Sequence, residues 1–450
     1  MNLRIGCIIS LLMIAGIANA QPNKDTIIST YAFSVKQCVE FASKNNLQVK
    51  NAITDLKQQE QTNRGVTSAA LPKLNVSGNI TDYLKLPVSL LPGEIIGQPA
   101  GTFVPVTFGT KYNANAAVAL QQVVFDGQVF VGLQARKAAI DFYEKNIDVV
   151  LENVKSNIYK VYYQLVASKT QIAQIDANID RLTRLEHDAN ELFKNGFAEK
   201  LDVDKASVQL ANLITEKQSA ENQVANGYLG LKLLIGMPPQ DSLVLTDSVT
   251  DEEIKDGLLT EDGYNYASRV EFQYAEIGKR LNEYNIKRYK LAALPTLSLN
   301  GSFSKQAQRT KFDIFGKGDW FTTSYVGINL NFSLFDGFQR RSDLEKARLD
   351  LQRSNDQMDY LKISIDKEVA EATNNYRNAI NTLDFQKKNI ALAEKVYEQA
   401  KKKFEVGTGS TTEITNAQTD LRVAQNNYIN ALYNAIIAKV DYQKATGKLN

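Results

Sequence analysis

Apolar side chains recur at alternating steps of three and four residues along one unbroken stretch, residues 339–404. This spacing is typical of the contact seam of a coiled coil. No glycine or proline interrupts the stretch, and a helix of this length would extend roughly 100 Å, far beyond the diameter of a small domain. The pattern therefore predicts a helical rod and not a helix inside a globular core. Its seam includes Val369, Ala372, Tyr376, Ala379 and Leu383.

A second stretch, residues 128–194, shows the same seam, and the same short motifs flank both stretches. Phe-Asp-Gly precedes each stretch, at residues 125–127 and 335–337. Phe-x-x-Gly ends each stretch, at residues 193–196 and 404–407. Recurrence of motifs at a fixed offset is the signature of an internal repeat. The chain is therefore predicted to be a duplicate of one long unit.

Short segments ahead of each rod alternate between apolar and polar side chains, which predicts strands with one dry and one wet face. They pair into two expected hairpins, 74–125 and 297–335. Residues 85–111 hold four of the nine prolines, so we expect a long loop there. A soluble β-sandwich would show the same alternation, although rods of this length disfavour it. The expected strands cover residues 74–84, 112–125, 297–304 and 325–334.

Aspartate and glycine stand between strand and rod in both halves of the chain. Aspartate is a good helix N-cap and glycine permits a sharp change of backbone direction. Strand-to-helix joints are therefore expected at Asp126, Gly127, Asp336 and Gly337. A glycine just past a helix also permits a left-handed turn, which predicts that the rods reverse at Gly196 and Gly407.

Shorter helices, 199–234 and 411–445, are expected to run back along the rods after these reversals. They cover only about half of each rod, so the other half needs a different partner. Helices predicted at 34–70 and 262–292 have suitable lengths to stack end to end with the returning ones. Each half would then be a pair of rods with a strand hairpin at one end and a helical turn at the other.

Residues 1–20 have the features of a secretory signal: an early arginine, an apolar run and the small-residue ending Ala-Asn-Ala. A membrane anchor is the alternative, although the apolar run is short for a span. We expect a signal peptide at 1–20, a first repeat at 21–236, an equatorial connector at 237–263 and a second repeat at 264–450. Removal of the signal would leave Cys38 as the one cysteine, which predicts no internal disulfide and a buried thiol.

The 52 basic and 50 acidic residues are interspersed, so no basic patch favours nucleic acid. After residue 20 no apolar run is long enough to span a bilayer as a helix. A membrane crossing would therefore use strands. Four strands cannot close a barrel, so closure would require several copies of the chain. The aromatic residues of the second hairpin's loop suit a lipid interface, and they are Phe312, Phe315, Trp320 and Phe321.

The order of helix, hairpin, rod, glycine turn and helix, repeated twice, resembles the TolC-type outer membrane efflux proteins, also called outer membrane factors. The opening segment 33–42, Leu-Pro before each hairpin and the motifs at 334–337 and 404–408 support the resemblance. It implies an α+β membrane protein built as a homotrimer. Four strands per chain would form a twelve-stranded transmembrane β-barrel, and the antiparallel coiled-coil helices would form a hollow tunnel. The implied location is the bacterial outer membrane, with the helical tunnel in the periplasm.

The resemblance also implies a function. Such proteins are the channel-tunnels of tripartite efflux or type I secretion systems and passively conduct small molecules or polypeptides to the exterior. The implied partners are a periplasmic adaptor (membrane fusion) protein, an inner-membrane pump of the RND or ABC type, and outer-membrane lipid. No cofactor and no metal is implied.

In this family the helical turns form the entrance, contact the adaptor and narrow the tunnel with polar contacts and carboxylates. This chain departs from the family pattern because Phe404, Gly409 and Asn416 replace the usual tyrosine, arginine and one aspartate. The resemblance therefore implies a looser or differently locked gate. An alternative stays open for Asp202 and Glu413, which also suit ordinary solvated first-turn positions of a helix. The implied tip residues are Phe193, Gly196, Asp202, Phe404, Gly407, Glu413 and Asn416.

Two other classes of function remain as alternatives. A structural periplasmic coiled-coil or adhesin-like protein would share the rods but lack a conducting pore, and the alternating hairpins disfavour it. An enzyme would need a catalytic constellation. The one histidine, His187, lies between two acids on the polar side of a rod with no nucleophile or metal-ligand pattern around it. We therefore expect no enzymatic activity.

Overall fold

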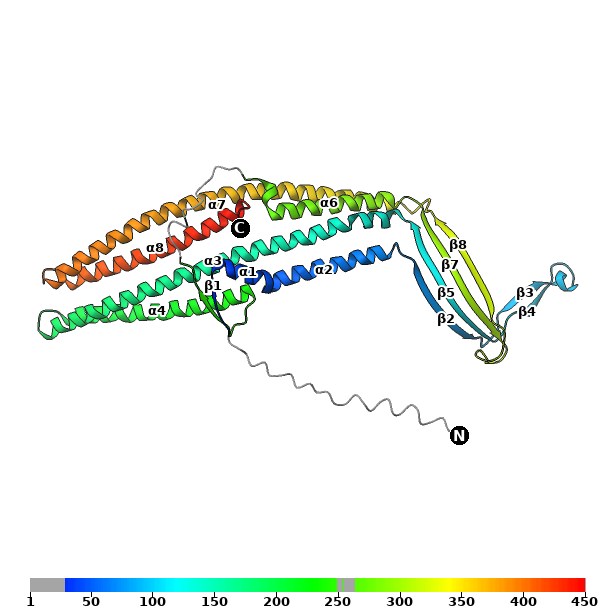
Figure 1. The fold of residues 1–450 in the computed structure, drawn as a ribbon, viewed down its shortest axis with the longest axis horizontal. Helices are drawn as coiled ribbons and strands as arrows, with labels where there is room; N and C mark the ends of the chain where they lie inside the picture. The colour runs from blue at the N-terminus through cyan, green and yellow to red at the C-terminus, as the bar shows by residue number, and fades with distance from the viewer. Residues whose placement is uncertain (1–28, 249–253, 255–263, 450) are drawn as a thin grey trace, which may run out of the picture.

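The computed structural model describes residues 29–248, 254 and 264–449. The expected signal peptide and most of the second half of the expected connector lie outside these residues. The molecule is elongated, with long helices along most of its length and a sheet at one end (Figure 1). Within the described residues, no helix combines the length and apolarity needed to cross a membrane.

Two very long helices run the length of the helical part, α3 (Gly127–Lys194) and α7 (Gln339–Glu405). They end where Gly196 and Gly407 adopt φ values of 77° and 76°, in the left-handed region that glycine occupies without strain. The chain then reverses into α4 (Lys200–Ile235) and α8 (Thr411–Ala445), which pack along α3 and α7 respectively. The buried side chains of α7 follow the expected seam, among them Val369, Ala372, Tyr376, Ala379 and Leu383.

The sheet-proximal halves of the rods are covered by shorter helices. In the first half, α1 (Val35–Asn45) and α2 (Leu47–Ser68) pack on α3. The expectation of one continuous helix over 34–70 is wrong, because the helix breaks at Asn46. The Asn46 side chain accepts hydrogen bonds from the N–H groups of Gln48 and Val49 and donates one to the Leu234 carbonyl. This buried amide satisfies the ends of two helices at once, which favours a break over a continuous helix.

In the second half, α6 (Val270–Leu291) packs on both α7 and α3. It begins later than the expected residue 262 and follows a short 3₁₀ turn, η3 (Tyr266–Ser268). Arg269 at this boundary is only 4% exposed. Its guanidinium donates to the Ala445 carbonyl and to the Glu368 carboxylate. The need to pair this buried charge explains the late start of α6.

A short parallel pair of strands joins the N-terminal segment to the region after α4. Strand β1 (Thr30–Phe33) pairs with β6 (Ser242–Leu245), directly ahead of the first helix. The apolar rings of β1 pack on Phe41, and the long-range pairing outweighs the local helical preference. Beside them, burial raises the pKa of the Cys38 thiol to about 12.

The sheet has four antiparallel strands in the order β2-β5-β7-β8. Their bounds are β2 (Lys73–Asp82), β5 (Tyr112–Phe125), β7 (Thr296–Arg309) and β8 (Phe321–Asn331). The second hairpin therefore stops short of residues 334 and 335, because the partner strand β7 begins only at Thr296, directly after Leu-Pro, and offers nothing further to pair with.

The segment 85–111 is not the structureless loop that its prolines predicted. It forms a small antiparallel pair, β3 (Val88–Pro92) with β4 (Phe103–Thr107), and a 3₁₀ turn, η2 (Gly93–Ile96). Proline is tolerated here because each strand of a two-stranded ribbon is an edge strand with one unpaired side. The ribbon extends beyond the outer end of the four-stranded sheet (Figure 1).

Candidate functional site

The four-stranded sheet has one apolar face and one polar face. The register places Leu74 opposite Leu120 and Val76 opposite Val118, and Val118 lies opposite Phe303 on the next strand. We call this side the apolar face. Its side chains are exposed within the single chain, with Leu74 at 70% and Val76 at 81%. The face continues across β7 and β8 through Leu297, Leu299, Val326, Ile328 and Leu330.

The opposite side, here called the polar face, carries amides and hydroxyls. One row across the four strands consists of Asn75, Ala119, Ser302 and Tyr325, each opposite the next. Within the chain, β2 and β8 are each paired on one side only. An apolar face with no cover and two open edges is unstable in water. The arrangement therefore favours lipid or protein on the apolar face and further pairing or cover at the two edges.

The first strand-to-helix joint is built by Asp126. Its carboxylate caps α3 by accepting hydrogen bonds from the N–H groups of Gln128 and Val129, at 2.8 and 3.4 Å. Gly127 is the first residue of the helix and its role differs from the expected change in backbone direction. A Cβ atom at this position would lie 2.5 Å from the Leu291 carbonyl oxygen, so glycine permits the close approach of α6.

The second joint has a different cap. Asp336 is not the N-cap residue of α7, but its carboxylate accepts a hydrogen bond from the backbone N–H of Arg340 at 3.1 Å. The same carboxylate pairs with the Arg340 side chain at 2.5 Å. Gly337 has φ 66° and Phe338, the N-cap residue, has φ 68°. A bulky residue in the left-handed region is rare, and the residue preference of phenylalanine does not predict it. The Phe338 ring packs edge-on against Phe335, with 5.5 Å between the ring centroids.

The far ends of the rods, here called the tips, hold the other candidate residues. Phe193 lies in the last turn of α3, and the ammonium of Lys200 lies 5.9 Å from its ring centroid. Phe404 packs at the edge of the core cluster formed by α3, α4, α7 and α8 near the tips. The two tips lie side by side at the end of the molecule opposite the sheet (Figure 1).

The two candidate carboxylates both lie in first helical turns, and each is near a lysine of its own helical hairpin. Asp202 lies 3.9 Å from the Lys205 ammonium. Glu413 accepts a hydrogen bond from the Lys403 ammonium at 2.7 Å, while its backbone N–H donates to the Ser410 hydroxyl. The structure therefore places both acids at the tips but pairs each within its own hairpin and not with the other.

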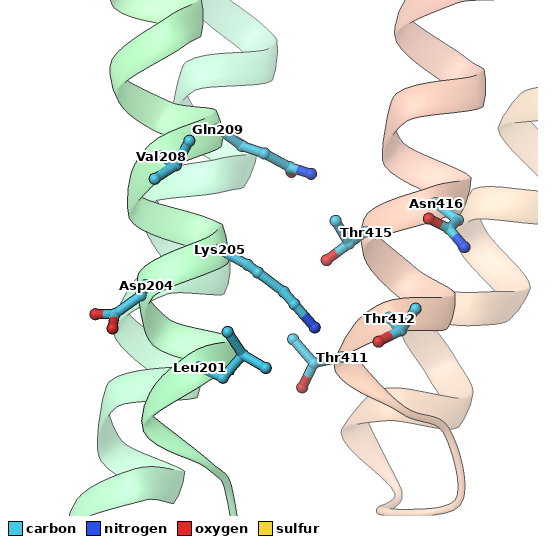
Figure 2. Close-up of a pocket in the computed structure, with 9 residues that line it drawn as sticks. All are labelled: Leu201, Asp204, Lys205, Val208, Gln209, Thr411, Thr412, Thr415 and Asn416. Atoms are coloured by element: carbon cyan, nitrogen blue, oxygen red, sulfur yellow. The ribbon is translucent and has the colours of Figure 1, made fainter.

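A cleft of about 490 Å³ separates α4 from α8 just above the tips. Figure 2 shows Lys205 and Gln209 of α4 directed toward Thr411 and Thr415 of α8. Asn416 also lines the cleft, so one predicted tip residue belongs to it. The other lining residues were not predicted, although their recurrence at steps of three and four along an exposed helical face is a signal that could have identified them.

Farther from the tips, a buried group of side chains joins α3 to α8; we call it the amide cluster. Asn178, which is 1% exposed, donates to the Gln425 side-chain carbonyl at 2.9 Å and accepts from the Gln418 amide at 2.9 Å. Arg181 donates to the same Asn178 oxygen at 2.8 Å. The two glutamines are a heptad apart on the seam of α8, which is a position where polar residues set the register of coiled coils.

The comparisons with known proteins agree with this architecture. Residues 266–448 match the family model described as outer membrane efflux protein. Outer membrane protein TolC of Escherichia coli (strain K12) is 21% identical over 357 residues, which are 76% of this chain and 71% of that protein. Residues 266–448 therefore carry the sequence signature of the outer membrane efflux proteins. Outer membrane efflux protein BepC of Brucella suis biovar 1 (strain 1330) is 21% identical over 356 residues, covering 76% of this chain and 74% of BepC.

Solved structures of outer membrane proteins share the fold of this chain. The outer membrane protein VceC of Vibrio cholerae superposes with a TM-score of 0.72 at 14% identity, covering 92% of this chain and 96% of VceC. The outer membrane channel CmeC of Campylobacter jejuni gives a TM-score of 0.72 at 18% identity, covering 92% and 86%. The fold of the chain is therefore that of these outer membrane proteins, and the predicted resemblance to the outer membrane efflux proteins is confirmed over residues 266–448.

Among the described residues, no group of three or more histidine, cysteine, aspartate or glutamate side chains is arranged to hold a metal ion. TolC, BepC and CmeC are named as an outer membrane protein, an outer membrane efflux protein and an outer membrane channel, respectively.

Proposed function

We propose that this outer membrane efflux protein is a passive channel-tunnel that opens to the exterior through a homotrimeric β-barrel. Three copies would join their four-stranded sheets into a twelve-stranded transmembrane barrel, and their helices into one tunnel in the periplasm. The two halves of each chain would be duplicated units, the first at 21–236 and the second at 264–450, joined by an equatorial connector at 237–263.

The two-faced sheet with open edges is the observation that supports this proposal most directly. Closure of a sheet into a barrel removes its edges, and an outward apolar face suits lipid while an inward polar face suits water. One copy has only four strands in this sheet, too few for a barrel with a water-filled lumen. Pairing of β2 in one copy with β8 in the next would satisfy both edges.

The helices support the same assembly. A packed globular helix has one buried stripe and one wet face, whereas α3 and α7 are too long to be covered by a single core. In a hollow cylinder they would have water on both the lumen side and the periplasmic side, with narrow apolar seams between neighbours. The polar side chains at the cleft between α4 and α8 would then face a partner or the tunnel wall.

The tips would form the periplasmic entrance and dock a periplasmic adaptor protein, which would connect the channel to an inner-membrane pump of the RND or ABC type. The cleft of about 490 Å³ between α4 and α8 suits a helical hairpin of the adaptor, because apolar and polar side chains line its α4 wall and hydroxyl and amide side chains line its α8 wall. Asp202 and Glu413, repeated three times, would surround the entrance. Rings of carboxylates favour cations.

A structural coiled-coil or adhesin-like protein without a pore is the second candidate. The rods alone are compatible with it, but the exposed apolar face of the sheet is not, because a water-soluble scaffold would have to cover it.

Two measurements on one preparation test the proposal. Purified protein in detergent should have the mass of three chains by light scattering after subtraction of the detergent. Reconstituted into planar lipid bilayers, it should give discrete conductance steps. A monomeric mass, or a trimer that gives no conductance at any voltage, would favour the scaffold.

A further inference from the structure

The polar face of the sheet is almost free of charge. From the register, it contains asparagine, glutamine, serine, threonine, alanine and glycine over most of its area, with a few larger uncharged side chains. Within the four strands that the structure describes, Lys73 is the one residue on this face that carries a full charge at neutral pH. No carboxylate of the four strands shares the face with it.

Lys73 lies at the helix-proximal end of β2, opposite Gln121 of β5. The same row continues across the sheet through Asn300 and Gly327. All of these side chains are small or uncharged, so none of them shields the ammonium. Lys73 is exposed in the single chain, and it belongs to an edge strand that would lie at the junction between neighbouring copies.

The other charges of the strands lie elsewhere. Asp82, Lys305 and Arg309 share the alternation of the apolar face, and Lys305 lies opposite Ala116 and Thr322. The carboxylates of the two strand-to-helix joints are also occupied. Asp126 caps α3, and Asp336 is paired with Arg340. The Lys73 ammonium is therefore the charge that the polar face presents at the inner end of the sheet.

We propose that Lys73, present three times around the barrel axis, forms a cationic ring at the inner end of an otherwise neutral barrel and determines the charge selectivity of that section. The ring would attract solutes with anionic groups, such as carboxylates or phosphates, as they pass from the helical tunnel into the barrel. The neutral amides and hydroxyls beyond it would offer hydrogen bonds without sorting solutes by charge. This inference rests on the proposed trimeric channel.

The physical basis is the distance over which the electrostatic field of a fixed charge extends in a narrow, water-filled pore. Exposed charges act over a Debye length of about 10 Å at 0.1 M salt but only about 3 Å at 1 M. Three lysines at one level would therefore bias ion permeation strongly at low salt and weakly at high salt. The acidic tips lie at the opposite end of the long helices (Figure 1), so the two charged levels would act independently.

The test is the reversal potential of the reconstituted channel under a gradient of potassium chloride. Relative to the unsubstituted protein, Lys73→Gln should shift the reversal potential toward that of a cation-selective pore, and Lys73→Glu should shift it further in the same direction. Both shifts should shrink when the two salt concentrations are raised tenfold at a constant ratio. The matched control is Lys305→Glu, which changes the same charge on the apolar face and should leave the reversal potential unchanged.

A second variant covers the case in which the charge reversal impairs assembly. Lys73→Cys, in a chain with Cys38→Ala, can be modified in the open channel with a positively or a negatively charged methanethiosulfonate reagent. The two adducts should shift selectivity in opposite directions. Equal reversal potentials for all Lys73 variants would contradict the proposed Lys73 ring. A shift from Lys305→Glu as large as the shift from Lys73→Glu would also contradict it. Absence of conductance from the unsubstituted protein would instead contradict the proposed channel itself.

Discussion

The amide cluster between α3 and α8 provides a quantitative prediction about what holds the two helical hairpins of one chain together. Replacement of Asn178 by alanine would remove its three hydrogen bonds, with lengths of 2.9, 2.9 and 2.8 Å. It would leave the amides of Gln418 and Gln425 without that partner, at exposures of only 4% and 7%. Arg181 reaches the surface more readily, so its lost bond should cost less.

A buried polar group that loses its partner destabilises a fold by about 1–3 kcal/mol. Two such groups predict that Asn178→Ala lowers the free energy of unfolding by about 2–6 kcal/mol. The assay is urea unfolding of the purified protein, monitored by circular dichroism at a fixed protein concentration because assembly adds to stability. The matched control is Asn157→Ala, an exposed asparagine on the same helix. Both variants gain the same helix propensity, so the difference between them isolates the cluster.

A triple variant separates burial from pairing. If Asn178, Gln418 and Gln425 all become leucine, no buried amide is left unpaired, and stability should return to within about 1.5 kcal/mol of the original. A difference between Asn178→Ala and Asn157→Ala of less than about 0.5 kcal/mol would refute the reasoning, because it would mean that water satisfies the two glutamines at no cost.

Three further predictions follow from other parts of the structure. The charge-neutral pair Asp202→Asn and Glu413→Gln should abolish any cation preference that arises at the tips; an unchanged permeability ratio in bilayers would remove both residues from the entrance. Burial and the neighbouring Glu271 carboxylate raise the pKa of Glu152, so the folded chain holds this proton more tightly than the unfolded chain and loses stability as pH rises through the raised pKa. Glu152→Gln should therefore raise the free energy of unfolding at pH 7, and this gain should disappear below about pH 4.3. A gain that does not vary with pH in unfolding titrations would contradict this prediction. Finally, Gly236→Ala should strongly destabilise the chain because Gly236 has φ 76° and a Cβ there would lie 2.4 Å from the Asn45 carbonyl oxygen. Gly230→Ala, near the C-terminal end of α4 where a Cβ would meet no atom within 4 Å, should instead stabilise the chain by up to about 1 kcal/mol. Similar melting temperatures for both variants would show that the packing at Gly236 is loose.

Features set by neighbouring residues could be predicted from the sequence. The rods follow from the spacing of side chains such as Val369 and Tyr376, and the reversals follow from Gly196 and Gly407, because helix seams and left-handed turns are local. The alternation on β2 and β7 likewise predicted a sheet with one apolar face. These signals recur in both halves of the chain, which made their order informative.

Features that depend on contacts between distant residues could not be predicted from the sequence. The break at Asn46 depends on the Leu234 carbonyl, and strand β1 depends on β6, far along the chain. The left-handed Phe338 runs against its own residue preference. At the candidate sites, Lys73 could be placed on the polar side of its strand from alternation alone, but its isolation from other charges needed the register of all four strands. The pairing of Asp202 and Glu413 with lysines likewise needed the geometry of the tips.

A density map of the purified assembly in lipid nanodiscs, obtained by electron cryo-microscopy, tests the central claim most directly. The account predicts three copies around one axis, with β2 of each copy hydrogen-bonded to β8 of the next and an open, water-filled path from the barrel through the helices. A single copy, or a threefold assembly whose axis is filled with side chains along the helices, would contradict it.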